Sequence, residues 1–294
     1  TYIDIVRSIK QVNPDMHIHA FSPLEVWQGA KTLGVSISEF LGQLKEAGLG
    51  TLPGTAAEIL DDEVRATLCP DKINTAQWLE VMEAAHGQGF NTTATIMYGH
   101  MEQYKHVARH LLRIRDLQEK TGGFTEFVIL PFIHMESPIY LKGRARKGPT
   151  FREAILIHAI SRLVLHPLFK NIQASWTKLG HEGVRACLQA GVNDLGGTLM
   201  NETITRAAGA AHGQETSPEE MEEIIRSIGR TPRQRSTTYG EITELQRQKS
   251  FGAVTLLEPT YTSAKKYERK QSKKKQELVR NELEPEKLTS QDII

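Results

Sequence analysis

The sequence is poor in cysteine and in long apolar runs. Its 294 residues contain only Cys69 and Cys187, which excludes a disulfide framework and a CxxC metal knuckle and suits a reducing compartment. No apolar run approaches the ~18–20 residues of a membrane-spanning helix, and no basic-then-apolar leader precedes a cleavage site. We therefore expect a cytoplasmic protein without a membrane partner.

An excess of charge of one sign is also lacking, since the formal net charge is +1. Residues 264–294 hold nine Lys/Arg and six Asp/Glu, so the remaining body holds 27 and 29. Nucleic-acid-binding domains usually present a basic face, so we expect no nucleic-acid partner. We predict a folded domain over residues 1–240 and a charged, poorly ordered extension over 241–294, in which 265–275 is a solvated helix or tail.

Apolar patterns alternate along the chain between strand-like and helix-like segments. Strands are expected at 16–21, 49–52, 92–98, 127–132, 171–176 and 192–195. Helices are expected at 2–10, 23–33, 36–48, 101–119, 151–165, 182–190 and 201–208. This alternation predicts repeated βα units with a parallel sheet. Six strands are fewer than the eight of a closed barrel, so the pattern indicates an α/β protein with an open or partial (β/α) barrel.

Two histidines two residues apart form the first candidate site. Alternation along a strand places His17 and His19 on one face, where two neutral imidazoles can ligate a metal ion. A His-x-His pair at a strand end resembles metal-dependent amidohydrolases, and His134 and Asp194 could supply further ligands. The alternative is that these side chains line a pocket for an organic substrate.

Further polar residues follow the other predicted strands. Glu102, His106 and His110 share one helical face, which predicts either a metal site or a polar face whose hydrogen bonds are satisfied. Gln173, Ser175 and Thr177 would share one face of a strand. The paired glycines after Asn193 and Asp194 would offer backbone amides to a polar ligand. These patterns alone indicate a barrel-like enzyme of unknown substrate.

Taken in order, seven strings of the sequence are far more specific than any one motif. They are HIHAFSPLE (17–25), GLGTLPGTAAEIL (48–60), TATIMYGHME (93–102), RDLQEKTGGFTEFVILPF (115–132), NIQASWTKLG (171–180), NDLGGTLMNETITRAAGA (193–210) and RQRSTTYG (233–240). Over 2–240 the chain resembles the radical S-adenosylmethionine (SAM) enzymes that make the deazaflavin FO and menaquinone precursors. Within them it is most similar to the tyrosine-condensing subunit, or C-terminal half, of FO synthase.

The resemblance implies a TIM-like (β/α) radical-SAM barrel with a [4Fe-4S] cluster on a CxxxCxxC loop. Such a transferase joins the 4-hydroxybenzyl group of L-tyrosine to 5-amino-6-(D-ribitylamino)uracil during coenzyme F420 biosynthesis. A tyrosine-dependent FO-forming subunit or domain is the implied partner. Menaquinone-route chemistry, like that of aminofutalosine synthase or dehypoxanthine futalosine cyclase, is the first alternative. A metal-dependent amidohydrolase using His17 and His19, and a non-catalytic remnant, are the others.

Positions matching the family motifs give the expected site residues. The expected SAM contacts are Met97, Tyr98, Glu102, Gln173, Asn193 and Asp194. The expected substrate contacts are His17, His19, Thr55, Glu58 and Ser175. No catalytic residue is assigned. Because the CxxxCxxC motif is absent, we expect a fragment without the first strands and the cluster loop, unable to bind the cluster or turn over alone.

Overall fold

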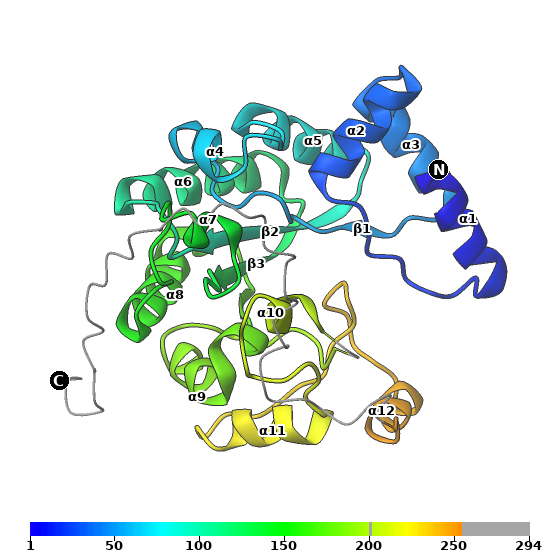
Figure 1. Cartoon of the computed structure of the whole chain (residues 1–294). Helices are drawn as coiled ribbons and strands as arrows, with labels where there is room; N and C mark the ends of the chain where they lie inside the picture. The colour runs from blue at the N-terminus through cyan, green and yellow to red at the C-terminus, as the bar shows by residue number, and fades with distance from the viewer. Residues whose placement is uncertain (200–201, 255–294) are drawn as a thin grey trace, which may run out of the picture.

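The structure is a computed structural model that describes residues 1–199 and 202–254. Four parallel strands lie at its centre in the order β1-β2-β3-β4 (Figure 1). They are β1 (Thr51–Leu52), β2 (Asn91–Tyr98), β3 (Phe124–Pro131) and β4 (Ile172–Ala174). Each strand pairs with the next along the chain, as repeated βα units require.

Single bridging residues extend the sheet at both edges. His19 pairs with Thr51 beside β1, and Asp194 pairs with Gln173 beside β4, both in parallel. The predicted strands at 16–21 and 192–195 are therefore wrong in length. Phe21 takes a left-handed φ of 64° and Gly196 one of 73°, so the chain turns away from the sheet within two residues of each bridge. The predicted parallel sheet of successive βα units is confirmed.

Helices surround the sheet in chain order, since α3, α5, α6, α8, α9 and α11 each contact the next. Within the described ranges the helices are α1 (Tyr2–Val12), α2 (Pro23–Leu33), α3 (Ile37–Ala47), α4 (Asp62–Leu68), α5 (Thr75–Gly87), α6 (Tyr104–Thr121), α7 (Pro138–Leu141), α8 (Phe151–Leu165), α9 (Trp176–Gln189), α10 (Ile204–Ala207), α11 (Pro218–Arg226) and α12 (Glu244–Phe251). None of them is long and apolar enough to cross a membrane.

Helix ends follow local sequence signals closely. Ser22 and Glu25 form a reciprocal capping box at the start of α2, and the helix ends at Gly34 with a left-handed φ of 69°. This pairing satisfies amides that the first helical turn leaves without partners. At the start of α3 the Ser36 hydroxyl accepts from the Glu39 amide at 3.1 Å, which is one half of such a box. The predicted bounds of these two helices are confirmed to within one residue.

Two predicted boundaries around β4 are wrong. The strand expected to reach 176 ends at Ala174, and α9 begins at Trp176 rather than at 182. Gly180 (φ 67°, ψ 176°) interrupts α9, which explains why the periodicity became clear only after it. Thr177 therefore lies in a helix and does not share a strand face with Gln173. Helix α12 falls within the predicted extension, while 265–275 lies outside the described residues.

The two faces of β2 have different environments. Ala94, Ile96 and Tyr98 are buried in the main core with residues of the surrounding helices. On the other face, Thr93 Oγ1 accepts a hydrogen bond from the Gly54 amide (2.9 Å) and Thr95 Oγ1 donates one to the Gly54 carbonyl (2.7 Å). A Cβ on Gly54 would lie 2.2 Å from the Thr93 carbonyl oxygen, so only glycine permits this approach. This face of β2 is therefore polar around Thr93 and Thr95.

Candidate functional site

A tight turn follows β2 at the carboxyl end of the sheet. The Glu102 carboxylate accepts hydrogen bonds from the amides of Gly99 (2.6 Å) and His100 (2.8 Å), and pairs with Arg146 at 3.2 Å. Its side chain is 4% exposed, and Gly99 has a left-handed φ of 94°. Glu102 thus closes this turn before α6 begins, rather than standing on the helix face with the histidines.

Met97 and Tyr98, the last residues of β2, differ in surroundings. The Met97 amide donates to the Glu58 carbonyl at 2.8 Å, which joins the loop after β1 to the carboxyl end of β2. Tyr98 is buried in the core, its hydroxyl has no partner among the described residues, and burial raises its pKa. The Tyr98 side chain therefore faces the helices, whereas the Met97 backbone lies beside Glu58.

The remaining expected substrate residues at this end belong to loops. Thr55 is exposed, and its carbonyl accepts from Trp78 Nε1 at 3.4 Å. Glu58 forms an ion pair with Lys72 at 2.6 Å. Ser175 Oγ lies 3.1 Å from Thr177 Oγ1 just after β4. Polar groups of the loops after β1 and β4 thus gather near the carboxyl ends of the strands, where barrel enzymes bind their ligands.

His17 and His19 point to the same hydroxyl group. Thr51 Oγ1 lies 2.8 Å from His17 Nε2 and 2.7 Å from His19 Nδ1, which confirms that they share a face. Burial lowers the pKa of His17 and lowers the pKa of His19 to about 4. Over the described residues, no third His, Cys, Asp or Glu completes a metal-binding group with them. The two imidazole rings are therefore held by hydrogen bonds to the Thr51 hydroxyl.

The other two ligands considered for a metal at His17 and His19 are engaged separately. His134 packs edge-on against Tyr140, with ring centroids 4.6 Å apart. The Asp194 carboxylate accepts two hydrogen bonds from the Arg235 guanidinium. The structure thus gives no geometric support to the amidohydrolase hypothesis.

A largely buried polar network lies near the amino ends of β3 and β4. Glu126 Oε2 accepts hydrogen bonds from Gln173 Nε2 (2.9 Å), Arg235 Nη2 (3.3 Å) and the Tyr239 hydroxyl. Arg235 Nη2 also donates to Asp194 Oδ1 (3.0 Å), and its guanidinium stacks 4.0 Å from the Tyr239 ring centroid. We call these five residues the Arg235 network.

This network borders a cavity of about 960 Å³. The cavity is lined by both edges of the six-segment sheet, His19 on one side and Asp194 on the other, together with residues 230–235 and 237. The sheet therefore curves as part of a barrel, and residues 230–237 lie between its two edges. Burial raises the pKa of Glu126, which the Tyr239 hydrogen bond partly offsets.

The six residues expected to contact SAM are divided by the structure. Met97 and Tyr98 end β2 and Glu102 closes the turn that follows it, whereas Gln173 and Asp194 belong to the Arg235 network. The Asn193 Oδ1 accepts from the Ile172 amide (2.9 Å) and from Arg162 (2.6 Å), which fastens the edge of β4. Sequence reasoning missed Glu126, Arg235 and Tyr239 as site residues, although each lies within a string that carried the resemblance.

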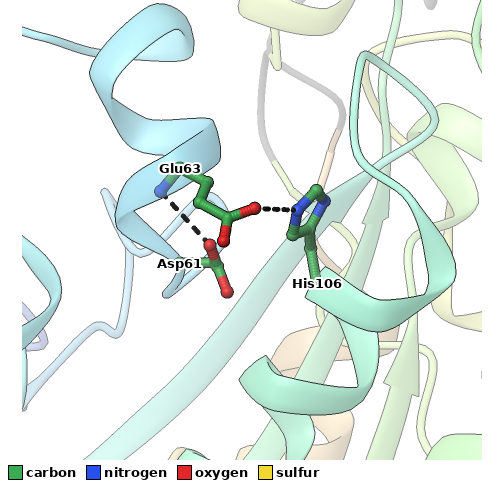
Figure 2. A group of neighbouring side chains, drawn as sticks. All are labelled: Asp61, Glu63 and His106. Atoms are coloured by element: carbon green, nitrogen blue, oxygen red, sulfur yellow. Dashed lines mark hydrogen bonds and ion pairs between the residues drawn. The ribbon is translucent and has the colours of Figure 1, made fainter.

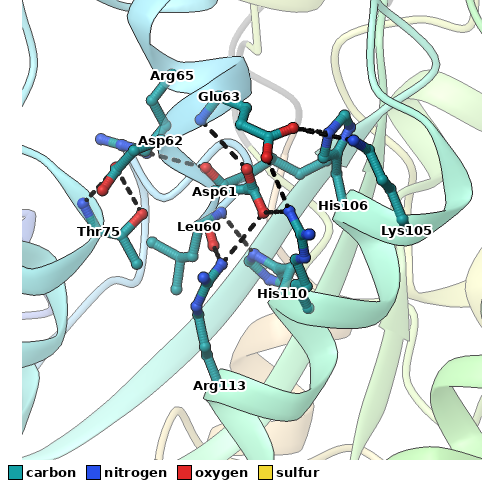
Figure 3. Close-up of polar contacts among 12 residues, drawn as sticks. Leu60, Asp61, Asp62, Glu63, Arg65, Thr75, Lys105, His106, His110 and Arg113 are labelled. Atoms are coloured by element: carbon teal, nitrogen blue, oxygen red, sulfur yellow. Dashed lines mark hydrogen bonds and ion pairs between the residues drawn. The ribbon is translucent and has the colours of Figure 1, made fainter.

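Asp61, Glu63 and His106 are close enough together to hold a metal ion (Figure 2). Lys105 and Arg109 instead pair with Glu63 at 3.0 and 3.2 Å, and Arg113 lies 3.4 Å from Asp61 (Figure 3). Hydrogen bonding to Lys105 lowers the pKa of Glu63 to about 2.

Each buried histidine of α6 accepts a hydrogen bond from a backbone amide. His106 Nδ1 accepts from the Gln103 amide (3.0 Å), so the neutral ring donates from Nε2 to Glu63 (3.1 Å) and keeps no lone pair for a metal. His110 Nδ1 accepts from the Leu60 amide (3.0 Å), and burial lowers the pKa of His110 to about 3. His106 is hydrogen-bonded through both ring nitrogens, whereas the buried Nε2 of His110 has no partner among the described residues. The contacts of Asp61, Glu63 and His106 join α4 to α6.

The two cysteines do not fit an iron–sulfur cluster. Cluster ligation requires several thiolates with matched spacing, whereas Cys69 and Cys187 are buried and unpaired. Burial raises the pKa of both thiols, that of Cys187 to about 12. Both therefore stay protonated near neutral pH, and we derive no reaction step through a cluster on this chain.

The fold is shared with methylornithine synthase (PylB), a radical SAM barrel enzyme, with a TM-score of 0.55 at 16% sequence identity. The superposition covers 79% of this chain and 63% of that one. The chain thus shares the α/β barrel fold of that enzyme, as predicted.

Sequence similarity is more specific. Residues 121–248 match the family model of the CofH/MqnC C-terminal region. The chain is 51% identical over 244 residues to the 5-amino-6-(D-ribitylamino)uracil--L-tyrosine 4-hydroxyphenyl transferase of Methanothermobacter thermautotrophicus, and 52% identical over 241 residues to the FO synthase of Nocardia farcinica. These matches cover 83% and 82% of this chain, but 66% and 28% of those relatives. The predicted resemblance to the tyrosine-condensing FO synthases is confirmed.

Proposed function

We propose that this chain forms part of a radical SAM transferase of FO biosynthesis. In this proposal the complete enzyme joins the 4-hydroxybenzyl group of L-tyrosine to 5-amino-6-(D-ribitylamino)uracil. The observation that carries it is the 51% identity to the Methanothermobacter transferase over 83% of this chain. A [4Fe-4S] cluster and SAM would supply the radical in the complete enzyme, and the cluster would be bound by cysteines other than Cys69 and Cys187.

The cavity beside the Arg235 network supports a role in binding the aminouracil. Its volume of about 960 Å³ is ample for a small organic molecule. Thr93, Gln173 and Thr198 line it with hydroxyl and amide groups, which suit a neutral, many-hydroxyl ligand. The Arg235 charge is already paired with two carboxylates, so this cavity favours an uncharged molecule over an anion.

The proposed partner is the tyrosine-dependent FO-forming subunit or domain. The FO synthases of Nocardia farcinica and Mycobacterium leprae match this chain over only 28% of their own length, which is compatible with a second activity in one polypeptide. The two unpaired, buried cysteines support a reducing cytoplasm as the compartment.

A chimera tests the proposed activity. The 244-residue matched region of the Methanothermobacter transferase is replaced by the corresponding region of this chain, and the purified chimera is reconstituted with iron and sulfide under anaerobic conditions. With SAM, a reductant, L-tyrosine and the aminouracil, we expect the condensation product by mass spectrometry. The unmodified transferase is the positive control, and this chain alone should give no product.

The same assay separates the alternatives. A chimera that shows the absorption of a loaded cluster but yields no product would contradict the proposal. Product from an aminodeoxyfutalosine-type substrate, with none from L-tyrosine, would instead favour the menaquinone route. No contact among the described residues favours that route, and the amidohydrolase hypothesis lacks a metal-binding group around His17 and His19 there.

A further inference from the structure

Lys178 is a partly buried cation without an ion-pair partner among the described residues. It lies four residues beyond the end of β4, in the first turn of α9. Its Nζ donates one long hydrogen bond, 3.3 Å, to the hydroxyl of Thr205. Within residues 1–199 and 202–254 no carboxylate lies within 4 Å of it. Charged side chains are seldom buried unless they are paired, so this arrangement is incomplete.

Two carboxylates lie near Lys178, but each already has a partner. Glu58 pairs with Lys72 at 2.6 Å. Glu202 accepts hydrogen bonds from the Thr205 amide (2.9 Å) and hydroxyl (3.0 Å). Both raise the pKa of Lys178 by electrostatic attraction, yet burial outweighs them and lowers it. The ammonium group therefore retains donors for a further acceptor.

Arg65 shows what a completed buried cation looks like in this chain. It is 3% exposed, and its guanidinium donates to the carbonyls of Ala57, Ile59 and Ile73. Backbone carbonyl groups of the protein therefore supply the acceptors for that cation. Lys178 has one hydroxyl instead, at the carboxyl end of the sheet where barrel enzymes bind ligands.

We propose that Lys178 binds the α-carboxylate of an amino-acid ligand, with Glu202 beside the ligand's ammonium group. The Nζ–H groups would donate to a carboxylate oxygen, and Glu202, whose hydrogen-bond donors are neutral, would favour the ligand's positive charge. Under the proposed function this ligand is L-tyrosine, so that assignment rests on the proposed function. SAM also carries an α-amino-acid group, and the test separates the two sources.

The test uses the whole chain and its Lys178→Met variant, which removes the charge at similar length. Calorimetric titrations compare L-tyrosine, tyramine, which lacks the carboxylate, and SAM. The wild-type chain should prefer L-tyrosine to tyramine by roughly 10- to 100-fold, the range of a hydrogen bond to a charged group. Lys178→Met should remove that preference. Lys170→Met, at an exposed position before β4, should keep it.

The unfolding temperature supplies a second readout that does not depend on ligand binding. Without ligand, Lys178→Met should raise it by about 2–4 °C, because an unpaired buried charge is replaced by an apolar group. A lower unfolding temperature would identify Lys178 as a structural donor to Thr205 and overturn the proposal.

Three binding results would also overturn it. These are equal affinity of the wild-type chain for L-tyrosine and tyramine, no binding of either, and loss of SAM binding alone in Lys178→Met. None of them depends on product formation, so a failure in these titrations leaves the chimera experiment to judge the proposed function separately.

Discussion

The Arg235 network and the surroundings of Lys178 treat charge in opposite ways. At the amino ends of β3 and β4, Arg235 is shared between Glu126 and Asp194, and Tyr239 and Gln173 donate to the same Glu126 oxygen. At the carboxyl end, Lys178 has a single long hydrogen bond. Buried groups that satisfy one another hold a structure together, whereas a partly buried cation with one neutral partner keeps donors that can bind something else.

The largest expected effect on stability comes from removing the cation of the Arg235 network. Arg235→Met leaves Glu126 and Asp194 buried without their cation, so the free energy of unfolding should fall by about 3–5 kcal/mol. Urea denaturation followed by tryptophan fluorescence measures it. Arg233→Met is the matched control, because Arg233 is 74% exposed and pairs with an exposed Glu241, and it should leave stability unchanged. Equal effects of the two variants would contradict the stabilising role of the Arg235 network.

The next largest effect is a pH dependence of the folding stability, which we attribute to Glu126. Burial raises its pKa in the folded chain, so the folded state binds a proton more readily than the unfolded state does. The contribution of Glu126 to stability is therefore highest below its ordinary pKa of about 4.5 and falls as pH rises through its raised value. Each unit of difference corresponds to about 1.4 kcal/mol.

Glu126→Gln removes that titration. Unfolding temperatures measured from pH 4 to pH 8 should show a smaller decline on the alkaline side for this variant than for the wild-type chain. Glu241→Gln, which alters an exposed carboxylate, should keep the wild-type profile. Identical profiles for wild type and Glu126→Gln would mean that Glu126 has an ordinary pKa in the folded chain.

The smallest expected effect on stability comes from removing the hydroxyl of Tyr239. Tyr239→Phe keeps the ring that stacks on Arg235 and removes one donor to Glu126, so stability should fall by about 1 kcal/mol. Tyr104→Phe, on an exposed ring, is the control. A loss as large as that of Arg235→Met would mean that the hydroxyl, rather than the charge pairing, dominates the network.

Much of the fold could be predicted because its signals are local. A capping box needs only Ser22 and Glu25, three residues apart, and the end of α2 needs only Gly34. The shared face of His17 and His19 follows from strand alternation alone. Each of these inferences depends on neighbours in the sequence, and the resemblance to known enzymes supplied the order in which the local units are arranged.

The site was harder to predict because its partners are distant in the sequence. Arg235 contacts Glu126 across 109 residues and Asp194 across 41, and no periodicity encodes such a pairing. Thr51 was not identified as the partner of both histidines for the same reason. The length of β4 was overestimated because Ser175 and Trp176 suit a strand by composition, whereas the chain begins a helix there.

The separation between Arg235 and Glu126 also has a consequence for biosynthesis. A chain made from its amino end presents Glu126, Gln173 and Asp194 before Arg235 exists, so these groups must remain hydrated while the sheet first assembles. Closing loops of this length costs entropy before any contact compensates for it, and distant pairings slow folding. The Arg235 network can therefore form only late, when synthesis has passed residue 239 and Arg235 and Tyr239 can reach Glu126.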